Sequence, residues 1–358
     1  MANISVNLSK NRKQIPASDA LGFGVHFTDH MLVMDYNLEQ GWHDIRIEPY
    51  GPVQFEPSMM ALHYGQAIFE GMKAFRAADG NINLFRARDH FRRFNNSARR
   101  VCIPEIDVEE LLAGLKKLLE IDNAWVPSAL GTALYIRPFI FATDQFLGVR
   151  PSHTYKLMII LSPVGAYYAE GFNPVKIMVE DQFVRAVRGG IGEIKTPGNY
   201  AASLLAAVRA KEKGFTQVLW LDAHELKWLE EVGTMNIMVK IDDQVITPPL
   251  NGSILPGVTR DSTIKILEQW HIPVLEKQIS IDEVMQAGKN GRLQEMFGTG
   301  TAAVISPVGS IHYKEDSAVI NHGVVGELSQ KLFNEITGIQ YGTRADTNNW
   351  IDTIKVSG

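Results

Sequence analysis

The sequence has almost no cysteine. Cys102 is the single cysteine among 358 residues, so the chain cannot form an internal disulfide and has no Cys-x-x-Cys metal site. No other pattern of metal ligands stands out, and we expect no metal. The lack of disulfides fits a reducing compartment, and we expect a cytoplasmic location.

Long apolar runs are also missing. No stretch approaches the roughly 18 residues that a membrane span requires, and the longest, such as Leu157–Leu161, have the length of a strand. The N-terminal residues Met1–Gln14 are polar throughout, without the apolar core of a secretion signal. These absences predict a soluble protein with no membrane partner.

Positive charge is not in excess. The chain has 35 Lys and Arg against 40 Asp and Glu, a formal net charge of −5. Nucleic-acid binding needs a basic surface, so we expect no nucleic-acid partner. With 45% hydrophobic and 21% charged residues the chain can bury substantial cores. At roughly 150 residues per domain, its length predicts two domains.

Apolar periodicity alternates between strand-like and helix-like segments, which predicts a mixed α/β (α+β) fold. We expect strands at His30–Tyr36, His43–Pro49, Ile82–Arg86, Ala133–Ala142, Tyr155–Ser162, Val175–Glu180, Gln217–Leu221 and Met235–Ile241. We expect helices at Leu62–Phe69 (ended by Gly71), Asp89–Arg99, Val108–Glu120 (capped by Asp107), from Pro197 to Gly214, after the capping box Ser280-x-x-Glu283 (ended by Gly288), and at Val324–Ile336 (ended by Gly338).

A cluster of turn-forming residues interrupts this alternation. Gly171, Asn173 and Pro174 lie between two strand-like runs and indicate a connector at 169–176. We therefore predict an N-terminal domain at 1–168 and a C-terminal domain at 177–358.

Three glycine-containing segments could bind an anion. Arg188–Thr196 resembles a P-loop but has Ile194 where that motif needs glycine before the lysine, and no GxGxxG is present. This argues against nucleotide hydrolysis and a Rossmann dehydrogenase. Leu255–Arg260 leads into a helix, where the N–H groups of Val258 and Thr259 could hold an anion or form an ordinary helix start. Gly298–Ala303 allows close approach of a ligand, or is a tight turn between strands.

Lys195 lies between a Gly-rich segment and a predicted helix. Most lysines are solvated surface residues, whereas a lysine in a cleft can form a Schiff base with an aldehyde cofactor. Lys195 and the two turns together indicate pyridoxal 5'-phosphate, which needs a lysine, an anion site and an acid facing its ring nitrogen.

Longer strings of residues extend this interpretation. GGIGEIKTPGNYAASL (Gly189–Leu204), EEVGTMNIM (Glu230–Met238), LPGVTR and FGTGTAA resemble the branched-chain amino acid aminotransferases, class IV pyridoxal-phosphate enzymes of fold type IV. HFTDHML, LHYGQAIFEGMKAF, LYIRPF and SPVGAYY resemble the same family earlier in the chain. The resemblance implies a smaller N-terminal α/β domain and a larger C-terminal domain with a pseudobarrel-like β core.

The resemblance also implies roles at the cofactor. Lys195 would hold it as a Schiff base, Tyr200 would bind its O3′ and Glu231 would face its ring nitrogen, with Glu230 as the rival. A carboxylate there favours the protonated ring. The phosphate contacts that the resemblance implies are Arg93 (with Arg92 as the rival), Val258, Thr259 and Thr301.

The substrate pocket that the resemblance implies is largely apolar, which suits Leu, Ile and Val side chains. Its residues would be Phe23, Tyr64, Phe69, Tyr135, Tyr167, Thr234 and Ala302. The N–H groups of Thr301 and Ala302 would hold the α-carboxylate, and Arg137 would bind the γ-carboxylate of glutamate, or form a structural ion pair instead. Tyr64 and Val149 would reach the neighbouring subunit's site, which implies a homodimer.

The implied activity is transamination of branched-chain amino acids with 2-oxoglutarate. Some relatives carry a redox Cys-x-x-Cys just after the turn that corresponds to Gly298–Ala302. Here Ala303 and Ser306 occupy the two cysteine positions. A D-amino acid aminotransferase or an aminodeoxychorismate lyase is the alternative within the class. A non-catalytic cofactor-binding protein is the alternative outside it, although such a protein would usually lack Lys195, Tyr200 or Glu231.

Overall fold

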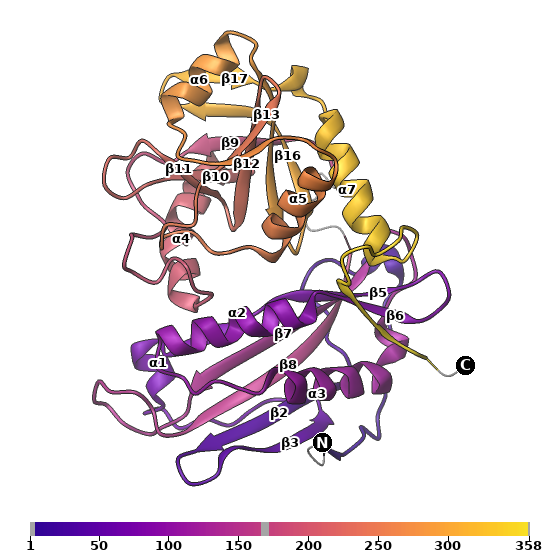
Figure 1. Ribbon diagram of the computed structural model, residues 1–358. Coiled ribbons are helices and arrows are strands. Elements are labelled where there is room, and N and C mark those ends of the chain that lie inside the picture. The colour runs from indigo at the N-terminus through magenta and orange to yellow at the C-terminus, as the bar shows by residue number, and fades with distance from the viewer. Residues whose placement is uncertain (1–3, 166–171, 357–358) are drawn as a thin grey trace. The chain divides into compact units, whose positions relative to one another are not determined.

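The computed structural model describes residues 4–165 and 172–356, and its contacts group the chain into two units (Figure 1). The first unit contains Met1–Tyr167, Lys195–Pro197 and Gly338–Gly358, and the second contains Tyr168–Ile194 and Gly198–Thr337. The division at 169–176 stays a prediction. The grouping adds that Lys195 and the end of the chain belong with the first unit.

The first unit contains a nine-stranded sheet. Its strands pair antiparallel, except that the edge strand at Ser5–Val6 runs parallel to its neighbour at Gly41–Pro49. Across the sheet the strands are β1 (Ser5–Val6), β3 (Gly41–Pro49), β2 (His30–Asn37), β8 (Tyr155–Val164), β7 (Ala133–Ala142), β5 (Met72–Arg76), β6 (Ile82–Phe85) and β18 (Ile351–Ile354). The short strand β4 (Ala67–Phe69) pairs with β7 beside β5.

Two helices, α2 (Ala87–Arg100) and α3 (Val108–Ile121), pack on this sheet (Figure 1). Their apolar side chains join those of the strands in one buried core. The Asp107 side chain accepts a hydrogen bond from the N–H of Glu110, as the predicted cap requires. The opposite face of β7 bears Tyr135 and Arg137, which are only partly buried.

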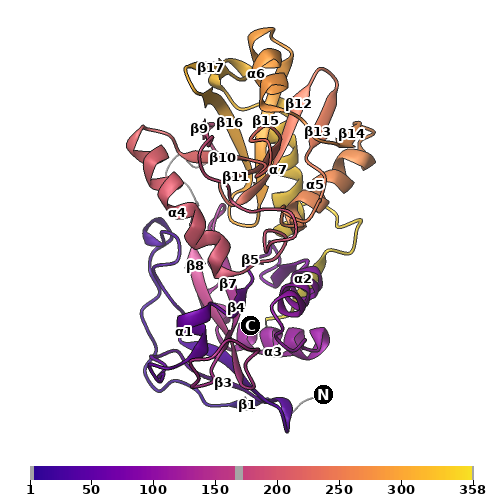
Figure 2. The same cartoon turned by 90° about the vertical axis from the view of Figure 1, so that its left-hand side faces the viewer.

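The second unit contains another nine-stranded sheet, and six of its strands close into a barrel (Figure 2). The ring closes because β11 pairs with β12 as well as with β10. The ring consists of β11 (Leu229–Val232), β10 (Gln217–Leu221), β9 (Val175–Val179), β16 (Val304–Tyr313), β15 (Leu293–Gly300) and β12 (Met235–Ile241). The strands β13 (Gln244–Thr247), β14 (Val274–Glu276) and β17 (Asp316–Val319) extend it. This barrel confirms the predicted β core.

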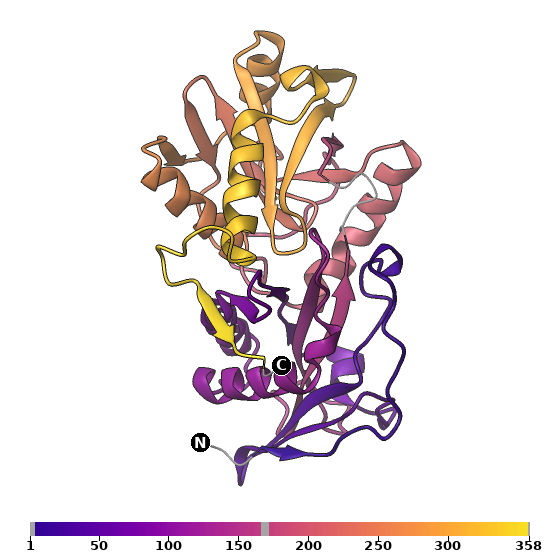
Figure 3. The ribbon, with the colours of Figure 1, turned by 90° about the vertical axis from the view of Figure 1, so that its right-hand side faces the viewer.

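The longer helices after Ile194 are α4 (Pro197–Glu212), α5 (Val258–Gln269), α6 (Ile281–Lys289) and α7 (Glu327–Gln340). Helix α7 lies along strands of the second unit (Figure 3). The Glu295 carboxylate of β15 caps its start, since it accepts hydrogen bonds from the N–H groups of Leu328 and Ser329. Of the helices within 4–165 and 172–356, none is long and apolar enough to cross a membrane.

The predicted strands are all present, with ends that differ by at most a few residues. Helix α4 begins at Pro197, as predicted, and Ser280 and Glu283 form the predicted capping box.

The predicted helix at Leu62–Phe69 is correct only as far as Tyr64. Helix α1 (Met60–Tyr64) ends at Gly65, which takes the left-handed conformation with a φ of 65°. The next residues form β4, which pairs with β7. Gly71 has another role, because a Cβ there would lie 2.0 Å from the Tyr135 hydroxyl. The glycine admits the Tyr135 ring and does not end a helix.

Two other predicted helix ends are wrong by a few residues. Gly288 lies inside α6, where a Cβ would lie 2.6 Å from the Ala318 Cβ. Gly338 lies inside α7, which starts at Glu327 rather than Val324, and the Arg344 side chain covers it. Both glycines permit close packing within the fold, a reason that the local sequence does not reveal.

The capping box at the start of α6 predicts a measurable contribution to stability. Ser280→Ala removes the hydrogen bond to the N–H of Glu283 and should lower the free energy of unfolding by about 1 kcal/mol. Equilibrium urea denaturation measures this, with Ser317→Ala on the exposed side of β17 as the control. Equal effects of the two substitutions would contradict the capping role.

Candidate active site

The backbone of Lys195 is fixed by hydrogen bonds to two elements of the first unit. Its N–H donates to the Ser97 hydroxyl of α2 at 3.0 Å, and its carbonyl accepts from the N–H of Phe69 in β4 at 3.0 Å. The neighbouring Thr196 hydroxyl donates to the carbonyl of Ala67 at 2.8 Å. These bonds set the direction in which the half-buried Lys195 side chain leaves the backbone.

Asn199 organises the Gly-rich segment that precedes Lys195. Its amide donates to the carbonyls of Ile191 at 2.8 Å and Ile194 at 2.9 Å. Gly192 packs so closely in this segment that a Cβ would lie 2.2 Å from the Ser253 carbonyl oxygen. The glycine and the asparagine of the GGIGEIKTPGNY string thus hold the turn in place.

Five predicted residues of the first unit form one chain of contacts. The rings of Phe23 and Tyr135 meet edge to face, with centroids 5.1 Å apart. The Tyr135 hydroxyl accepts a hydrogen bond from Arg137 Nη2 at 3.0 Å. The Arg137 guanidinium lies 4.8 Å from the centroid of the Phe69 ring, and Lys195 Nζ lies 5.2 Å from the same centroid. The rings of Phe23, Phe69 and Tyr135 therefore form an aromatic wall. The side chains of Arg137 and Lys195 lie against it.

Two further polar features lie on this wall. Arg137 Nε is buried and has no hydrogen-bond partner in the part of the chain that the structure describes. Lys73, opposite Tyr135 in the β5–β7 pairing, is buried, and burial lowers the pKa of its amine to about 8. Sequence reasoning missed Lys73, although MKAF belongs to one of the strings that carry the family resemblance.

A fully buried carboxylate orients Arg93. Glu70 accepts from Arg93 Nε at 2.7 Å and from Nη2 at 2.8 Å, while His90 Nδ1 lies 3.0 Å from Glu70 Oε2. Burial acts to raise the pKa of Glu70, but the charge and hydrogen bonds of Arg93, together with His90, hold it well below its usual range. Arg92 instead points to solvent and pairs with Asp89.

Three predicted residues of the second unit line one hollow. Tyr200 belongs to α4, Glu231 to β11 and Thr234 to the turn between β11 and β12. The hollow is lined by Arg185, Ile194, Asn199, Tyr200, Ser203, Glu231, Gly233, Thr234 and Leu255.

The Glu231 carboxylate in this hollow has fixed partners. Oε2 lies 3.3 Å from Arg185 Nε, and Oε1 accepts from the N–H of Leu255 at 2.7 Å. Arg185 is itself buried, and its Nη2 donates to the carbonyls of Gly192 at 3.0 Å and of Ser253. Glu231 is thus presented as an oriented, charge-paired carboxylate.

The two predicted anion turns also lie in the second unit. Val258 and Thr259 open α5, and Gly257 at its N-cap supplies no side-chain cap. Asn236 of β12 holds this start, since its amide donates to the Leu255 carbonyl at 2.9 Å. Thr301 and Ala302 lie in the turn that joins β15 to β16.

The remaining predicted residues do not join these groups. Tyr64, at the end of α1, is 41% exposed, and Val149, in the segment between β7 and β8, is 87% exposed. Tyr167 lies outside the described residues.

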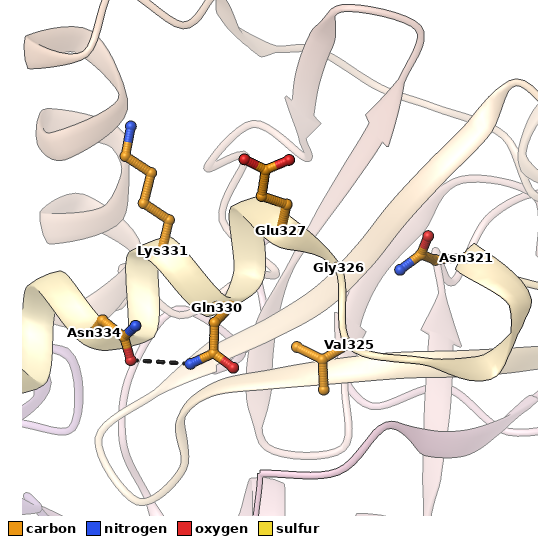
Figure 4. Close-up of a pocket in the computed structure, with 7 residues that line it drawn as sticks. All are labelled: Asn321, Val325, Gly326, Glu327, Gln330, Lys331 and Asn334. Atoms are coloured by element: carbon orange, nitrogen blue, oxygen red, sulfur yellow. Dashed lines mark hydrogen bonds between the residues drawn. The ribbon is translucent and has the colours of Figure 1, made fainter.

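Another hollow lies around the start of α7 (Figure 4). Gln330 donates to Asn334 at 2.9 Å there. Its lining consists of Asn321, Val325, Gly326, Glu327, Gln330, Lys331 and Asn334, none of them a predicted site residue.

Sequence reasoning missed the residues that hold the predicted ones. Glu70, Ser97, Arg185 and Asn236 fix Arg93, Lys195, Glu231 and the start of α5 respectively. Glu70 and Asn236 lie inside the FEGMKAF and EEVGTMN strings, which was the available signal.

Known proteins resemble most of the chain. A family model described as amino-transferase class IV matches residues 67–311. The branched-chain-amino-acid aminotransferase 2 of Bacillus subtilis (strain 168) is 56% identical over 347 residues, 97% of this chain and 96% of its own.

Solved structures agree. A branched-chain amino acid aminotransferase of Escherichia coli superposes with a TM-score of 0.77 at 28% identity, covering 91% of this chain and 99% of its own. A branched-chain aminotransferase of Thermoproteus uzoniensis, solved with norvaline, gives a TM-score of 0.77 at 26% identity, covering 91% of this chain and 100% of its own.

The Glu70–Arg93 pair predicts different effects for two neighbouring arginines. Arg93→Ala leaves a buried carboxylate without its cation and should lower the free energy of unfolding by about 3–5 kcal/mol. Arg92→Ala removes an exposed pair and should cost less than about 1 kcal/mol. Urea denaturation measures both, and a similar loss in the two variants would refute the buried pairing.

Proposed function

Since the chain belongs to the branched-chain amino acid aminotransferases of the amino-transferase class IV family, we propose that it transfers the amino group of leucine, isoleucine or valine to 2-oxoglutarate, using pyridoxal 5'-phosphate. The observation that carries this proposal is the anchored Lys195, whose amine lies on the Phe69 ring together with the Arg137 guanidinium. An amine, an aromatic wall and a second cation are what a transaminase with apolar and dicarboxylate substrates needs.

The charged and polar groups of the candidate site fit the ring nitrogen and the phosphate of this cofactor. Glu231 is a buried, oriented carboxylate of the kind that pairs with a protonated pyridine nitrogen. Gly257 leaves the start of α5 without a side-chain cap, which suits a phosphate. Arg93 supplies a buried guanidinium whose Nε and Nη2 are the atoms that Glu70 engages.

Each of these residues has a proposed role. Lys195 Nζ binds the cofactor's aldehyde carbon, Tyr200 binds its O3′ and Glu231 keeps its ring nitrogen protonated. Arg93, the N–H groups of Val258 and Thr259, and Thr301 bind the phosphate. Arg93 suits this role better than Arg92 because Glu70 orients it away from bulk water, whereas the Arg92 side chain is 66% exposed.

Lys195 is also the proposed acid–base group. When bound, pyridoxal phosphate supplies an electron sink that acidifies the substrate Cα–H. Lys195 Nζ would act as the base that takes the proton from the substrate Cα and then as the acid that gives it back. The hydrogen bonds of the Lys195 backbone to Ser97 and Phe69 keep the amine within reach during this transfer.

The proposed substrate contacts are those that the family resemblance implies. Phe23, Tyr64, Phe69, Tyr135, Tyr167 and Thr234 are the proposed neighbours of the branched side chain. The N–H groups of Thr301 and Ala302 bind the α-carboxylate. Arg137 binds the γ-carboxylate of glutamate and 2-oxoglutarate, and its buried Nε, which has no partner within 4–165 and 172–356, supports this role.

The proposed assembly is a homodimer in which Tyr64 and Val149 complete the neighbouring subunit's site. Their exposure in the single chain supports this arrangement, because neither side chain is buried among the described residues.

A panel of amino donors tests the function. With 2-oxoglutarate as acceptor, L-leucine, L-isoleucine and L-valine should each give glutamate, because the wall of the pocket is apolar. Coupled glutamate detection measures the rates, with Lys195→Ala as the blank that should show no turnover. Faster turnover of D-alanine, or release of pyruvate from aminodeoxychorismate, would instead assign another class IV activity.

Arg137 predicts a split between the two kinds of acceptor. Arg137→Met should raise the KM for 2-oxoglutarate by about tenfold to a hundredfold, since a charge-assisted contact is lost. The KM for 4-methyl-2-oxopentanoate should stay nearly unchanged. Arg292→Met, exposed in the second unit, is the matched control. An equal loss with both acceptors would assign Arg137 a structural role.

A further inference from the structure

Two adjacent glutamates on β11 have different surroundings. Glu231 is paired with Arg185 and accepts the N–H of Leu255. Glu230 is also buried, at 4% exposure, but within 4–165 and 172–356 its Oε1 has a hydrogen bond with the Ser253 hydroxyl only. Its other oxygen, Oε2, is buried without a hydrogen-bond partner among the residues described.

The number of protons around Ser253 decides the charge of Glu230. The N–H of Ser253 donates to Asn251 Oδ1 at 3.2 Å, which identifies the oxygen as the Asn251 atom that faces Ser253. The Ser253 hydroxyl oxygen lies 2.7 Å from the same Oδ1 and within hydrogen-bond distance of Glu230 Oε1. A hydroxyl has one proton for these two acceptors. If it donates to Asn251, Glu230 must donate its own proton to the Ser253 oxygen.

The unpartnered Oε2 favours the same state. A buried carboxylate oxygen without a partner is far more costly than a buried carbonyl oxygen of a neutral acid. The charged groups that act on Glu230 are Arg185, Glu231 and Asp222. Burial raises the pKa of Glu230 to about 7, with Glu231 and Asp222 acting in the same direction and Ser253 and Arg185 opposing.

The segment that Glu230 contacts also holds the cofactor-facing pair. The Ser253 carbonyl accepts from Arg185, and the N–H of Leu255 donates to Glu231. Gly192 packs closely against the Ser253 carbonyl. Any shift of Ser253 therefore moves its own carbonyl, which accepts from Arg185. It also moves the N–H of Leu255, two residues later, which donates to Glu231.

We propose that Glu230 is a positioning residue that, as a neutral carboxylic acid, donates to Ser253 and so holds the segment Asn251–Leu255 and the Arg185–Glu231 pair in place. Loss of the proton turns the donor into a second acceptor and leaves the Ser253 hydroxyl with too few protons. The link to the cofactor rests on the proposed function, whereas the protonation of Glu230 does not.

The first test uses the protein without cofactor. The unfolded carboxyl titrates near pH 4.5, so between that pH and about 7 the folded protein keeps a proton that the unfolded chain has lost. Wild-type stability should therefore fall as pH rises through this window, relative to Glu230→Gln, whose amide donates to Ser253 at every pH. Urea denaturation across the window measures the difference. Parallel stability curves, or failure of Glu230→Gln to fold, would overturn the proposal.

The second test measures pyridoxal phosphate affinity by the fluorescence of the protein. The ratio of the wild-type Kd to that of Glu230→Gln should rise about tenfold from about pH 6 to about pH 8, as the proton-holding form becomes a minor population. The ratio removes titrations that both proteins share. A constant ratio overturns the proposal. Absence of cofactor binding in both proteins would count against the proposed function, and the stability curves would still decide the state of Glu230.

Discussion

The hydrogen bonds that hold the backbone of Lys195 are the constraint on which the site depends. A lysine side chain is long and flexible, so its amine can react at one place only if the backbone beneath it is fixed. Ser97 and Phe69 provide that anchor from α2 and β4, and the Phe69 ring also carries the guanidinium of Arg137. The Lys195 amine, the Phe69 ring and the Arg137 guanidinium are thus placed by the same few contacts.

Buried carboxylates with different partners supply the electrostatics. Glu70 is fully buried and ionised because Arg93 and His90 surround it. Glu231 is paired with Arg185, whereas among the described residues its neighbour Glu230 has a hydrogen bond with the Ser253 hydroxyl only. The same residue type therefore orients Arg93, pairs with Arg185 or contacts the Ser253 hydroxyl, and its partner in the fold decides which of these it does.

Local pattern predicted most of the secondary structure, since strands such as Ala133–Ala142 carry their own periodicity. It failed at Leu62–Phe69, where Gly65 ends a short helix and pairing with β7 makes the rest a strand. The role of Gly71 was misinterpreted because the Tyr135 ring, which leaves no room for a Cβ at position 71, lies far away along the sequence. The resemblance singled out Lys195 and Arg93 as candidates, but Ser97 and Glu70 hold them through contacts between elements, which spacing along the chain does not encode.

The central claim is that Lys195 is the amine that carries the cofactor. Reduction of the pyridoxal phosphate-loaded protein with borohydride, followed by peptide mass spectrometry, locates the attachment directly. The account predicts one phosphopyridoxyl group per chain, on the peptide that contains Lys195. Attachment to Lys73, the buried lysine whose pKa is lowered to about 8, or to no lysine at all, would contradict it.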